Sequence, residues 1–364
     1  MTDAAATRER LLKKSWGKLL LGLLSLIYGA AVSLRSLLYR AGILRSRRLK
    51  ARVVSIGNLT VGGTGKTPAV LLAAATLKKH GTSIAILSRG YGGKGSGQDV
   101  TTLLDDREVP SAQECGDEPW MMHQTLMGQG IPILVAKNRS QAGELAVTFY
   151  HSEVIILDDG FQHLKLDRDL DIVLVNALQP FGDGHLLPLG FLREPRRALH
   201  RAGLIVLTHS DRAHKSRLES IEAEIKEINP RAPIVHASHK ADFLMDLKTG
   251  KKSPPAELAG RKIVSFCGIA EPESFEASLL ELDAKIAQKW RYPDHHPYAP
   301  REIKSLQHIR DGMPVVTTLK DFTRFPPGWA DALDGEVYAL GIKLHLSKGR
   351  EAWISALASL VPPQ

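Results

Sequence analysis

The chain has 364 residues, which is long enough for two domains and a sizeable hydrophobic core. Hydrophobic residues make up 43% of it and charged residues 24%, the proportions of an ordinary globular protein. The net charge of +9 arises in residues 1–50, which contain eleven Lys and Arg and two acidic residues. Because the other 314 residues are neutral overall, the composition argues against a nucleic-acid groove spread over the fold.

The cysteine content points to a reducing compartment. Cys115 and Cys267 are the only cysteines, they lie far apart, and neither belongs to a Cys-x-x-Cys pair. We expect both to be buried free thiols.

Residues 19–34 form a run of sixteen uncharged residues with Lys and Arg on both flanks. We expect a helix that lies in the cytoplasmic face of a membrane, with its basic residues toward anionic lipid. A single membrane span and a buried core helix are the alternatives, although positive charge on both flanks gives a span no clear orientation. A signal peptide is disfavoured, because it would export the phosphate-binding loop that follows.

A glycine-rich segment at residues 55–68 follows an apolar run (53–56) and precedes an Ala-rich one (69–77). Strand, Gly-rich turn, Gly-Lys-Thr and helix together form the context of a phosphate-binding loop. Glycine leaves backbone N–H groups free to wrap a phosphate, and the positive end of the helix dipole points at the same place. Lys66 would reach the β- and γ-phosphates, and the Thr67 hydroxyl would bind Mg²⁺. The expected nucleotide-binding residues are Thr60, Val61, Gly62, Gly63, Thr64, Gly65, Lys66 and Thr67.

The next elements deliver polar residues to the same edge of the predicted sheet. A buried strand at 83–88 ends at Arg89 and Tyr91, and in a doubly wound sheet the carboxyl ends of strands line the ligand crevice. These two residues are candidates for substrate contact, and a solvated turn is the alternative. Asp117 and Glu118 open a helix, where acids are common caps and where a catalytic carboxylate would also be well placed.

A second strong signal is the apolar run 154–157 followed by Asp158 and Asp159. A buried strand that ends in an acid is the usual second half of a P-loop site, where it delivers the acid toward Mg²⁺. We therefore expect this strand beside the phosphate-loop strand. Another short strand, at 131–136, ends close to the basic Arg139.

The fold class that these elements predict is α/β, with a P-loop-type doubly wound and mostly parallel sheet. Composition places a domain boundary near 235–260, and alternating strands and helices continue beyond it. We predict an N-terminal membrane-associating segment (1–50), a P-loop core (51–240) and a smaller α/β domain (241–364) that closes over the site. Adjacent His295 and His296 lack further nearby ligands and give only a weak metal signal.

Several blocks together resemble one family, the tetraacyldisaccharide 4′-kinases of lipid A biosynthesis, which are membrane-associated P-loop kinases. The blocks that carry the resemblance are residues 57–68, 88–91, 116–119, 158–163, 187–190, 192–195, 266–270, 294–296 and 317–321. Thr60, where P-loops generally have Gly, is itself similar to the family. Leu319 departs from it, because the family usually has Glu there.

The resemblance implies that ATP, with Mg²⁺, phosphorylates the 4′-hydroxyl of a tetraacylated glucosamine disaccharide 1-phosphate at the cytoplasmic face of the bacterial inner membrane. It implies that Lys66 and Thr67 contact phosphate and metal, and that Asp158 and Asp159 form the acidic pair near the metal. It makes Asp117 the catalytic base, paired with His295. The further contacts that it implies, to metal, phosphate or substrate, are Glu118, Arg139, Arg193 and Glu194.

Two other functions share parts of this pattern. A nucleotide switch or metal-insertion GTPase shares the loop and the acidic strand, but the guanine-specific tetrapeptide Asn-Lys-x-Asp does not occur in the sequence. A membrane-surface adaptor with a degenerate loop would not need intact Lys66, Thr67 and Asp158.

Overall fold

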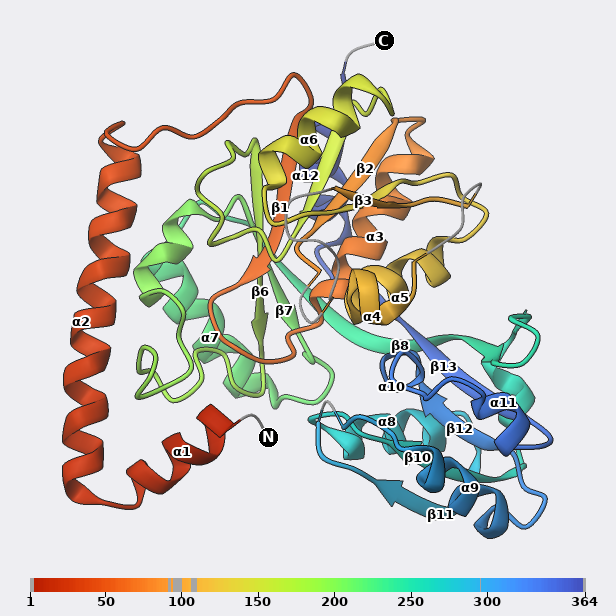
Figure 1. The fold of residues 1–364 in the computed structure, drawn as a ribbon. Helices are drawn as coiled ribbons and strands as arrows, with labels where there is room; N and C mark the ends of the chain where they lie inside the picture. The colour runs from red at the N-terminus through yellow and green to blue at the C-terminus, as the bar shows by residue number, and fades with distance from the viewer. Residues whose placement is uncertain (1–2, 91–92, 94–99, 106–109, 295, 363–364) are drawn as a thin grey trace.

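A computed structural model of the chain describes residues 3–90, 93, 100–105, 110–294 and 296–362. Its strands form one sheet in the order β11-β10-β12-β13-β8-β7-β6-β1-β5-β2-β4-β3, with β9 paired to β8 (Figure 1). The strands are β1 (Arg52–Asn58), β2 (Ile84–Ser88), β3 (Thr101–Leu103), β4 (Ile133–Val135), β5 (Val154–Asp158), β6 (Leu170–Asn176), β7 (Leu204–Thr208), β8 (Ile234–Asp246), β9 (Lys252–Ser253), β10 (Lys262–Cys267), β11 (Lys285–Arg291), β12 (Val315–Thr318) and β13 (Val337–Lys348). The helices are α1 (Asp3–Leu12), α2 (Ser15–Arg40), α3 (Lys66–Lys79), α4 (Ala112–Cys115), α5 (Asp117–Leu126), α6 (Arg139–Thr148), η1 (Arg196–Arg201), α7 (Lys215–Ile228), η2 (Pro255–Leu258), α8 (Pro272–Glu281), α9 (Pro300–Ile309), α10 (Leu319–Phe322), α11 (Trp329–Ala332) and α12 (Arg350–Ala358).

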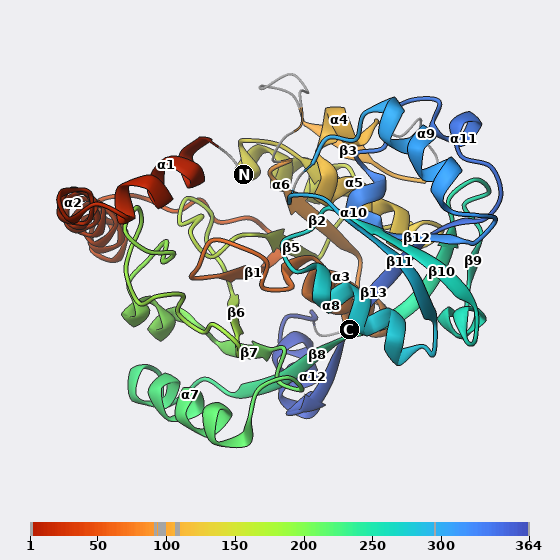
Figure 2. The same cartoon turned by 90° about the horizontal axis from the view of Figure 1, so that it is seen from below.

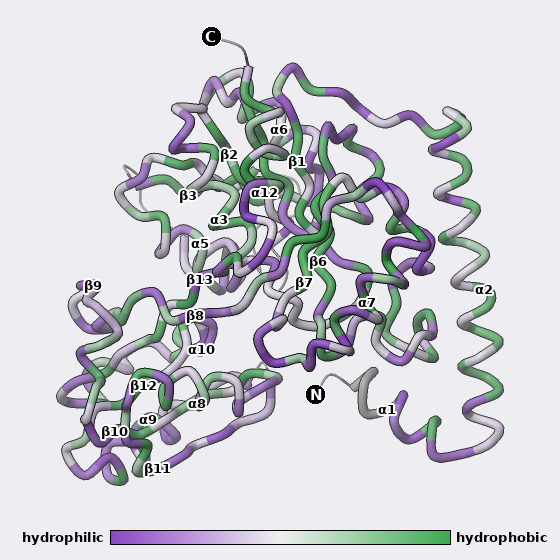
Figure 3. Tube along the Cα trace, turned by 180° about the vertical axis from the view of Figure 1, so that it is seen from behind, coloured by the Kyte–Doolittle hydropathy of each residue, from purple (hydrophilic) through white to green (hydrophobic). Residues whose placement is uncertain are grey.

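The sheet has two parallel halves joined by one antiparallel pair. The first sheet half consists of β4, β2, β5, β1, β6, β7 and β8, and the second sheet half of β11, β10, β12 and β13; neighbours within each half are parallel. Strands β8 and β13 pair antiparallel and join the halves. The inner strands β1, β6 and β7 are buried along nearly their whole length, as parallel strands covered on both faces are, and Figure 3 shows the hydrophobic stretches of β6 and β7. The predicted α/β, mostly parallel fold is confirmed.

The joining pair lies where the domain boundary was predicted. The region 235–260 was expected to hold a domain boundary, but β8 runs unbroken through its first twelve residues. The strand is hard to recognise because its middle, around His239 to Asp242, is polar and only partly buried, and it lacks an apolar run there. The division into domains at residue 240 stays a prediction.

The C-terminal helix α12 packs against the first sheet half. Trp353 and Leu357 belong to the same buried cluster as Ala73 of α3, and the Trp353 indole Nε1 donates a hydrogen bond to Thr76 Oγ1 at 3.1 Å. Figure 2 likewise shows α12 beside β8. The chain therefore leaves the first sheet half at β8 and returns to it at the end of β13.

Helix α2 lies along the outside of the first sheet half, opposite the second sheet half (Figures 1 and 2). Within the described residues, α2 is the one helix whose length and apolar composition would allow it to cross a membrane. The residues that it buries, Gly17, Leu21, Ser25 and Gly29, are four apart and so lie on one face. The apolar residues that it leaves exposed include Leu19, Leu23, Leu26, Ile27, Leu34 and Leu37. The alternative of a buried core helix is therefore wrong.

The segment 183–193 receives this docked face. Ser25 Oγ donates to the Leu186 carbonyl at 3.0 Å, and a Cβ on Gly29 would come within 2.7 Å of the Leu186 side chain. The helix before it, α1, folds back so that the Arg8 guanidinium lies over the Phe191 ring at 4.4 Å. The N-terminal helices are thus joined to a segment that also reaches the phosphate loop.

Candidate active site

The phosphate loop lies between β1 and α3, as the sequence predicts. Strand β1 has β5 on one side and β6 on the other, both parallel to it, and α3 begins at Lys66. Gly65 has φ of +80°, a conformation that favours glycine, and a Cβ there would also overlap the imidazole of His239 on β8. The backbone N–H groups at the start of α3 are therefore presented at the carboxyl edge of the sheet.

The start of the loop is tied to segment 183–193. Thr60 forms an isolated bridge with Leu192, and the Val61 amide donates to the Phe191 carbonyl at 2.9 Å. The Arg193 amide donates to Leu59 O at 2.7 Å. Because this segment also contacts α2, backbone contacts connect the outer helix to the phosphate loop.

Asp159 is the centre of a cluster of cations. Its carboxylate accepts two 2.9 Å hydrogen bonds from Arg193 Nη1, and Lys66 Nζ lies 3.8 Å from its Oδ1. Burial opposes its charge, but Lys66 and then Arg193 outweigh burial and lower the pKa of Asp159. Arg139, which is 3% exposed, donates to the Asp159 backbone carbonyl at 3.2 Å. Asp159 is therefore ionised and holds both cations beside the phosphate loop.

Asp158 has a different environment, although it is the adjacent residue. It is 2% exposed, and its Oδ2 accepts a 3.0 Å hydrogen bond from Ser88 at the end of β2. Burial, followed by the nearby charges of Glu118 and Asp159, raises the pKa of Asp158 to about 7. Its Oδ1 has no hydrogen-bond partner. A buried carboxylate oxygen without a partner is costly unless a cation completes the site.

The residues at this position fit Mg²⁺. Mg²⁺ takes oxygen ligands, typically one or two carboxylates together with substrate phosphates and water. Asp158 has a free oxygen, and the Thr67 hydroxyl belongs to the first turn of α3. Within the described residues no three His, Cys, Asp or Glu side chains could hold a metal ion together. The candidate site is thus one that relies on a bound nucleotide for its remaining ligands.

Asp117, the predicted base, lies at the first position of α5 and meets the second sheet half. Its Oδ2 is 3.6 Å from Arg324 Nε, and its side chain is 28% exposed. Arg324 is held in place by Gly268 O and Lys320 O, to which its guanidinium donates hydrogen bonds at 3.2 Å. Arg324 belongs to no recognised motif and was not predicted from the sequence, although it follows the block 317–321 by three residues. His295 lies outside the described residues, so its predicted pairing with Asp117 stays a prediction.

The comparisons with known proteins agree with this geometry. The model of the tetraacyldisaccharide-1-P 4′-kinase family matches residues 17–360. The chain belongs to this family.

Similar curated proteins carry the same description. A tetraacyldisaccharide 4′-kinase of Elusimicrobium minutum is 39% identical over 356 residues, covering 98% of this chain and 95% of the relative. One of Anaeromyxobacter dehalogenans is 40% identical over 335 residues, covering 91% and 87%. A crystal structure of the "apo" form of LpxK from Aquifex aeolicus in complex with ATP has a TM-score of 0.73 at 28% identity, covering 97% and 99%.

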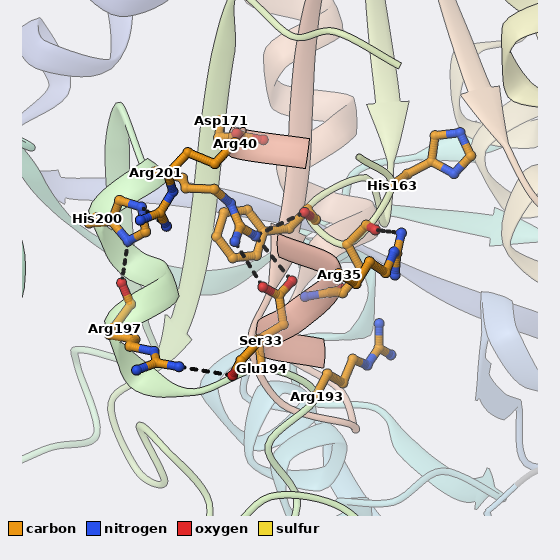
Figure 4. A network of polar contacts seen from close by, with 12 residues as sticks. Ser33, Arg35, Arg40, His163, Asp171, Arg193, Glu194, Arg197, His200 and Arg201 are labelled. Carbon is orange, nitrogen blue, oxygen red and sulfur yellow. Dashed lines mark hydrogen bonds and ion pairs between the residues drawn. The ribbon is translucent and has the colours of Figure 1, made fainter. Parts of the chain in front are cut away.

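Other predicted site residues of this 4′-kinase family member are already engaged within the protein. The Glu194 carboxylate, 4% exposed, accepts hydrogen bonds from Arg201 at 2.8 and 3.0 Å. Both oxygens of Glu194 are thus bonded to Arg201, and Glu194 stabilises the segment before η1 (Figure 4). Arg89 is exposed directly after β2, and Tyr91 lies outside the described residues.

The family block at 317–321 supports the second sheet half. Asp321 is fully buried and accepts hydrogen bonds from the Gly268 amide, the Tyr298 hydroxyl and Thr318 Oγ1 at 2.7–2.9 Å. Leu319, the departure from the kinase family, is 6% exposed and packs in the same apolar cluster as Tyr298. This substitution therefore contributes to the core.

The remaining expectations concern thiols and a possible metal. Cys115 and Cys267 are both free and buried, as expected. His296 lies 3.0 Å from Glu302, which acts as a capping residue of α9. This contact gives His296 a structural partner.

Proposed function

We propose that the protein transfers the γ-phosphoryl group of ATP to the 4′-hydroxyl of a tetraacylated disaccharide 1-phosphate, a step of lipid A biosynthesis. The observation that carries this proposal is the pair of adjacent acids at the phosphate loop. Asp159 is neutralised by Lys66 and Arg193, whereas Asp158 keeps a buried oxygen without a partner. Membership of the 4′-kinase family over residues 17–360 supplies the acceptor, and an ATP complex of the similar LpxK supports the donor.

The phosphate end of ATP would be bound by the loop backbone and by cations. N–H groups of residues 62–67 would surround the β-phosphate at the start of α3. Lys66 would stabilise charge on the transferred group, and Asp159 would keep its ammonium group in position. Arg193 shares that carboxylate, so it is a second cation available to the phosphates.

Mg²⁺ would be held by Asp158 and Thr67, with Glu118 close enough to raise the pKa of Asp158. When bound, Mg²⁺ would neutralise charge on the phosphate oxygens. Ser88 fixes the other oxygen of Asp158, so the free oxygen has a defined direction. This explains why a buried acid is tolerated here.

Asp117 would accept the proton of the 4′-hydroxyl. Its partial exposure leaves room for an acceptor, and Arg324 fixes the side chain from the second sheet half. The family resemblance adds His295 as its partner. A base held from both sheet halves would be complete only when the two are correctly placed against each other.

The acceptor is an amphiphile, which gives the exposed apolar face of α2 a role. We infer that α2 lies in the cytoplasmic face of the inner membrane, with Gly17, Leu21 and Ser25 against the protein and the opposite face in lipid. Such a position would let the acyl chains stay in the membrane during transfer.

One experiment tests the function directly. The purified protein is incubated in detergent with ATP, Mg²⁺ and the tetraacyldisaccharide 1-phosphate, and the lipid is analysed by mass spectrometry. We expect the addition of one phosphate with wild-type protein and none with Lys66→Ala. Failure of the folded wild-type protein to modify this acceptor would contradict the proposal.

A further inference from the structure

A side chain of β8 contacts the phosphate loop at its last glycine. His239 lies in the partly exposed middle of β8, and its imidazole Nε2 occupies the space that a Cβ on Gly65 would need. Gly65 is the residue at which the loop ends and α3 begins. Around Gly62 and Gly63, by contrast, a Cβ would meet no atom of the described residues within 4 Å beyond the neighbouring residues of the chain. The contact with His239 therefore supports the end of the loop, whereas its middle is open.

The other end of the loop has its own anchor. Thr60 bridges to Leu192, and the Val61 amide donates to the Phe191 carbonyl. The glycine-rich stretch 62–65 lies between this anchor and His239. Glycine has more backbone freedom than any other residue, so a stretch of this composition holds one shape only if its ends are fixed. The contact of His239 with Gly65 fixes the end that leads into α3.

His239 is in turn packed by His209, the residue that follows β7. The two imidazole centroids are 4.5 Å apart. His209 has φ of +55°, a conformation that residues other than glycine rarely adopt and that surrounding contacts must hold. Those contacts come from the next residue, because the amide and the hydroxyl of Ser210 both donate to the Ala237 carbonyl of β8 at 3.1 Å. The turn after β7 is thus fastened to β8, with the His209 ring against the His239 ring.

Both rings are uncharged at neutral pH. Burial, followed by the proximity of His209, lowers the pKa of His239 to about 3, and burial also lowers the pKa of His209. The Nδ1 atom of His239 has no hydrogen-bond partner among the described residues. The pair therefore acts on Gly65 through the shape and packing of its rings, and adds no charge beside Lys66.

We propose that His239 is a positioning residue, which together with His209 holds the phosphate loop at Gly65 in the conformation that receives the phosphates of ATP. This inference rests on the proposed function, in which the loop binds ATP. A loop whose backbone N–H groups are already in place loses less conformational entropy when the phosphates bind. Because His239 belongs to the strand that joins the two sheet halves, the shape of the loop also depends on that strand.

The test compares the binding of ATP and of inorganic tripolyphosphate, each with Mg²⁺, by calorimetry on the full chain in detergent. For His239→Ala we expect both Kd values to rise together, roughly tenfold, because the loop loses its preorganised shape. His239→Gln, which is uncharged and about as long as His, should restore most of the affinity for both ligands. His345→Ala, which removes an exposed imidazole from the neighbouring strand β13, is the matched control and should change neither Kd.

A second variant repeats the test without altering β8. His209→Asn removes the packing ring, and Asn tolerates the left-handed conformation of this position. We expect a smaller rise in both Kd values than for His239→Ala. If His239→Ala is unfolded by circular dichroism, His209→Asn and His239→Gln decide the matter. Unchanged Kd values in His209→Asn would then overturn the inference.

Three further results would overturn it. A weaker Kd for ATP with an unchanged Kd for tripolyphosphate would mean that His239 contacts the nucleoside. A lower melting temperature with both Kd values unchanged would mean that the ring pair only stabilises the fold. Wild-type protein that binds ATP but not tripolyphosphate would show that the loop does not receive phosphates by its own shape. Each of these would leave the kinase function intact, whereas wild-type protein that binds neither ligand would refute the proposed function as well.

Discussion

Two buried aspartates, one in each half of the molecule, lie at or just after the carboxyl end of a strand, β5 for Asp158 and β12 for Asp321. Asp158 closes β5 and keeps one oxygen without a partner, and its pKa is raised to about 7. Asp321, just after β12, accepts hydrogen bonds from Gly268, Tyr298 and Thr318, which occupy both of its oxygens. The two carboxylates are therefore similarly buried, but only Asp321 has hydrogen bonds to both of its oxygens.

The difference separates a ligand site from a structural centre. A buried acid whose oxygens are both bonded holds the chain in one arrangement, whereas a free oxygen is a cost that a bound cation can remove. Arg324 contacts both regions, because its Nη2 lies 3.5 Å from Asp321 and its Nε 3.6 Å from Asp117. The structural centre thus positions the proposed base.

The largest expected effect is in the first region. Lys66→Ala should reduce kcat on the order of 10³-fold or more, because it removes a cation from the transferred phosphoryl group. The variant should remain folded, since Asp159 keeps Arg193. Turnover is measured at saturating ATP with thermal unfolding as the control. A kcat close to wild type would mean that this loop does not hold the reacting nucleotide.

The second largest effect concerns the link between the regions. Asp117→Ala should lower kcat about 100-fold or more, as expected for loss of a general base, with little change in ATP affinity. Arg324→Ala should lower it less, and the double variant should lose much less than the product of the single losses. Measured kcat values for the three variants test this. Multiplicative losses would show that Asp117 and Arg324 act independently.

The parts of this site that sequence could predict are those set by local pattern. The apolar runs before Lys66 and Asp158 fix two neighbouring strands, and glycines fix the loop between strand and helix. The contacts that give each acid its character join distant positions, such as Ser88 with Asp158 and Arg324 with Asp117. Such contacts depend on how strands are ordered in the sheet, which no local pattern encodes.

The structural centre should govern stability. Asp321→Ala removes the acceptor of three buried hydrogen bonds and leaves their donors unsatisfied, so we expect a loss of about 3 kcal/mol or more in the free energy of unfolding. Urea unfolding monitored by tryptophan fluorescence measures it. Asp158→Asn, which has one such bond to lose, should be affected much less in the absence of ligands. Equal losses would remove the distinction between the two aspartates.

Asp158 also predicts a pH dependence. The pKa of Asp158 in the folded protein is raised to about 7. Its protonation therefore contributes fully to the free energy of unfolding below the pKa of the unfolded chain, and this contribution is lost as the pH rises through about 7. Asp158→Asn cannot lose this proton, so the variant should gain stability relative to wild type between pH 5 and pH 8. Melting temperatures across this range, without ATP or Mg²⁺, provide the measurement. Parallel curves would mean that Asp158 is already ionised.

The smallest effect tests whether the outer helix reaches the ligand site. Tyr28 of α2 donates a 2.9 Å hydrogen bond to the Arg193 carbonyl, and the Arg193 guanidinium holds Asp159. Tyr28→Phe removes this bond, worth about 1 kcal/mol, so kcat should fall by up to about fivefold while the KM for ATP stays constant. Tyr39→Phe on the same helix is the control, because Tyr39 contacts Arg35 through its ring. If Tyr28→Phe lowers the melting temperature but leaves kcat unchanged, α2 packs against the Asp158 region without positioning its side chains for catalysis.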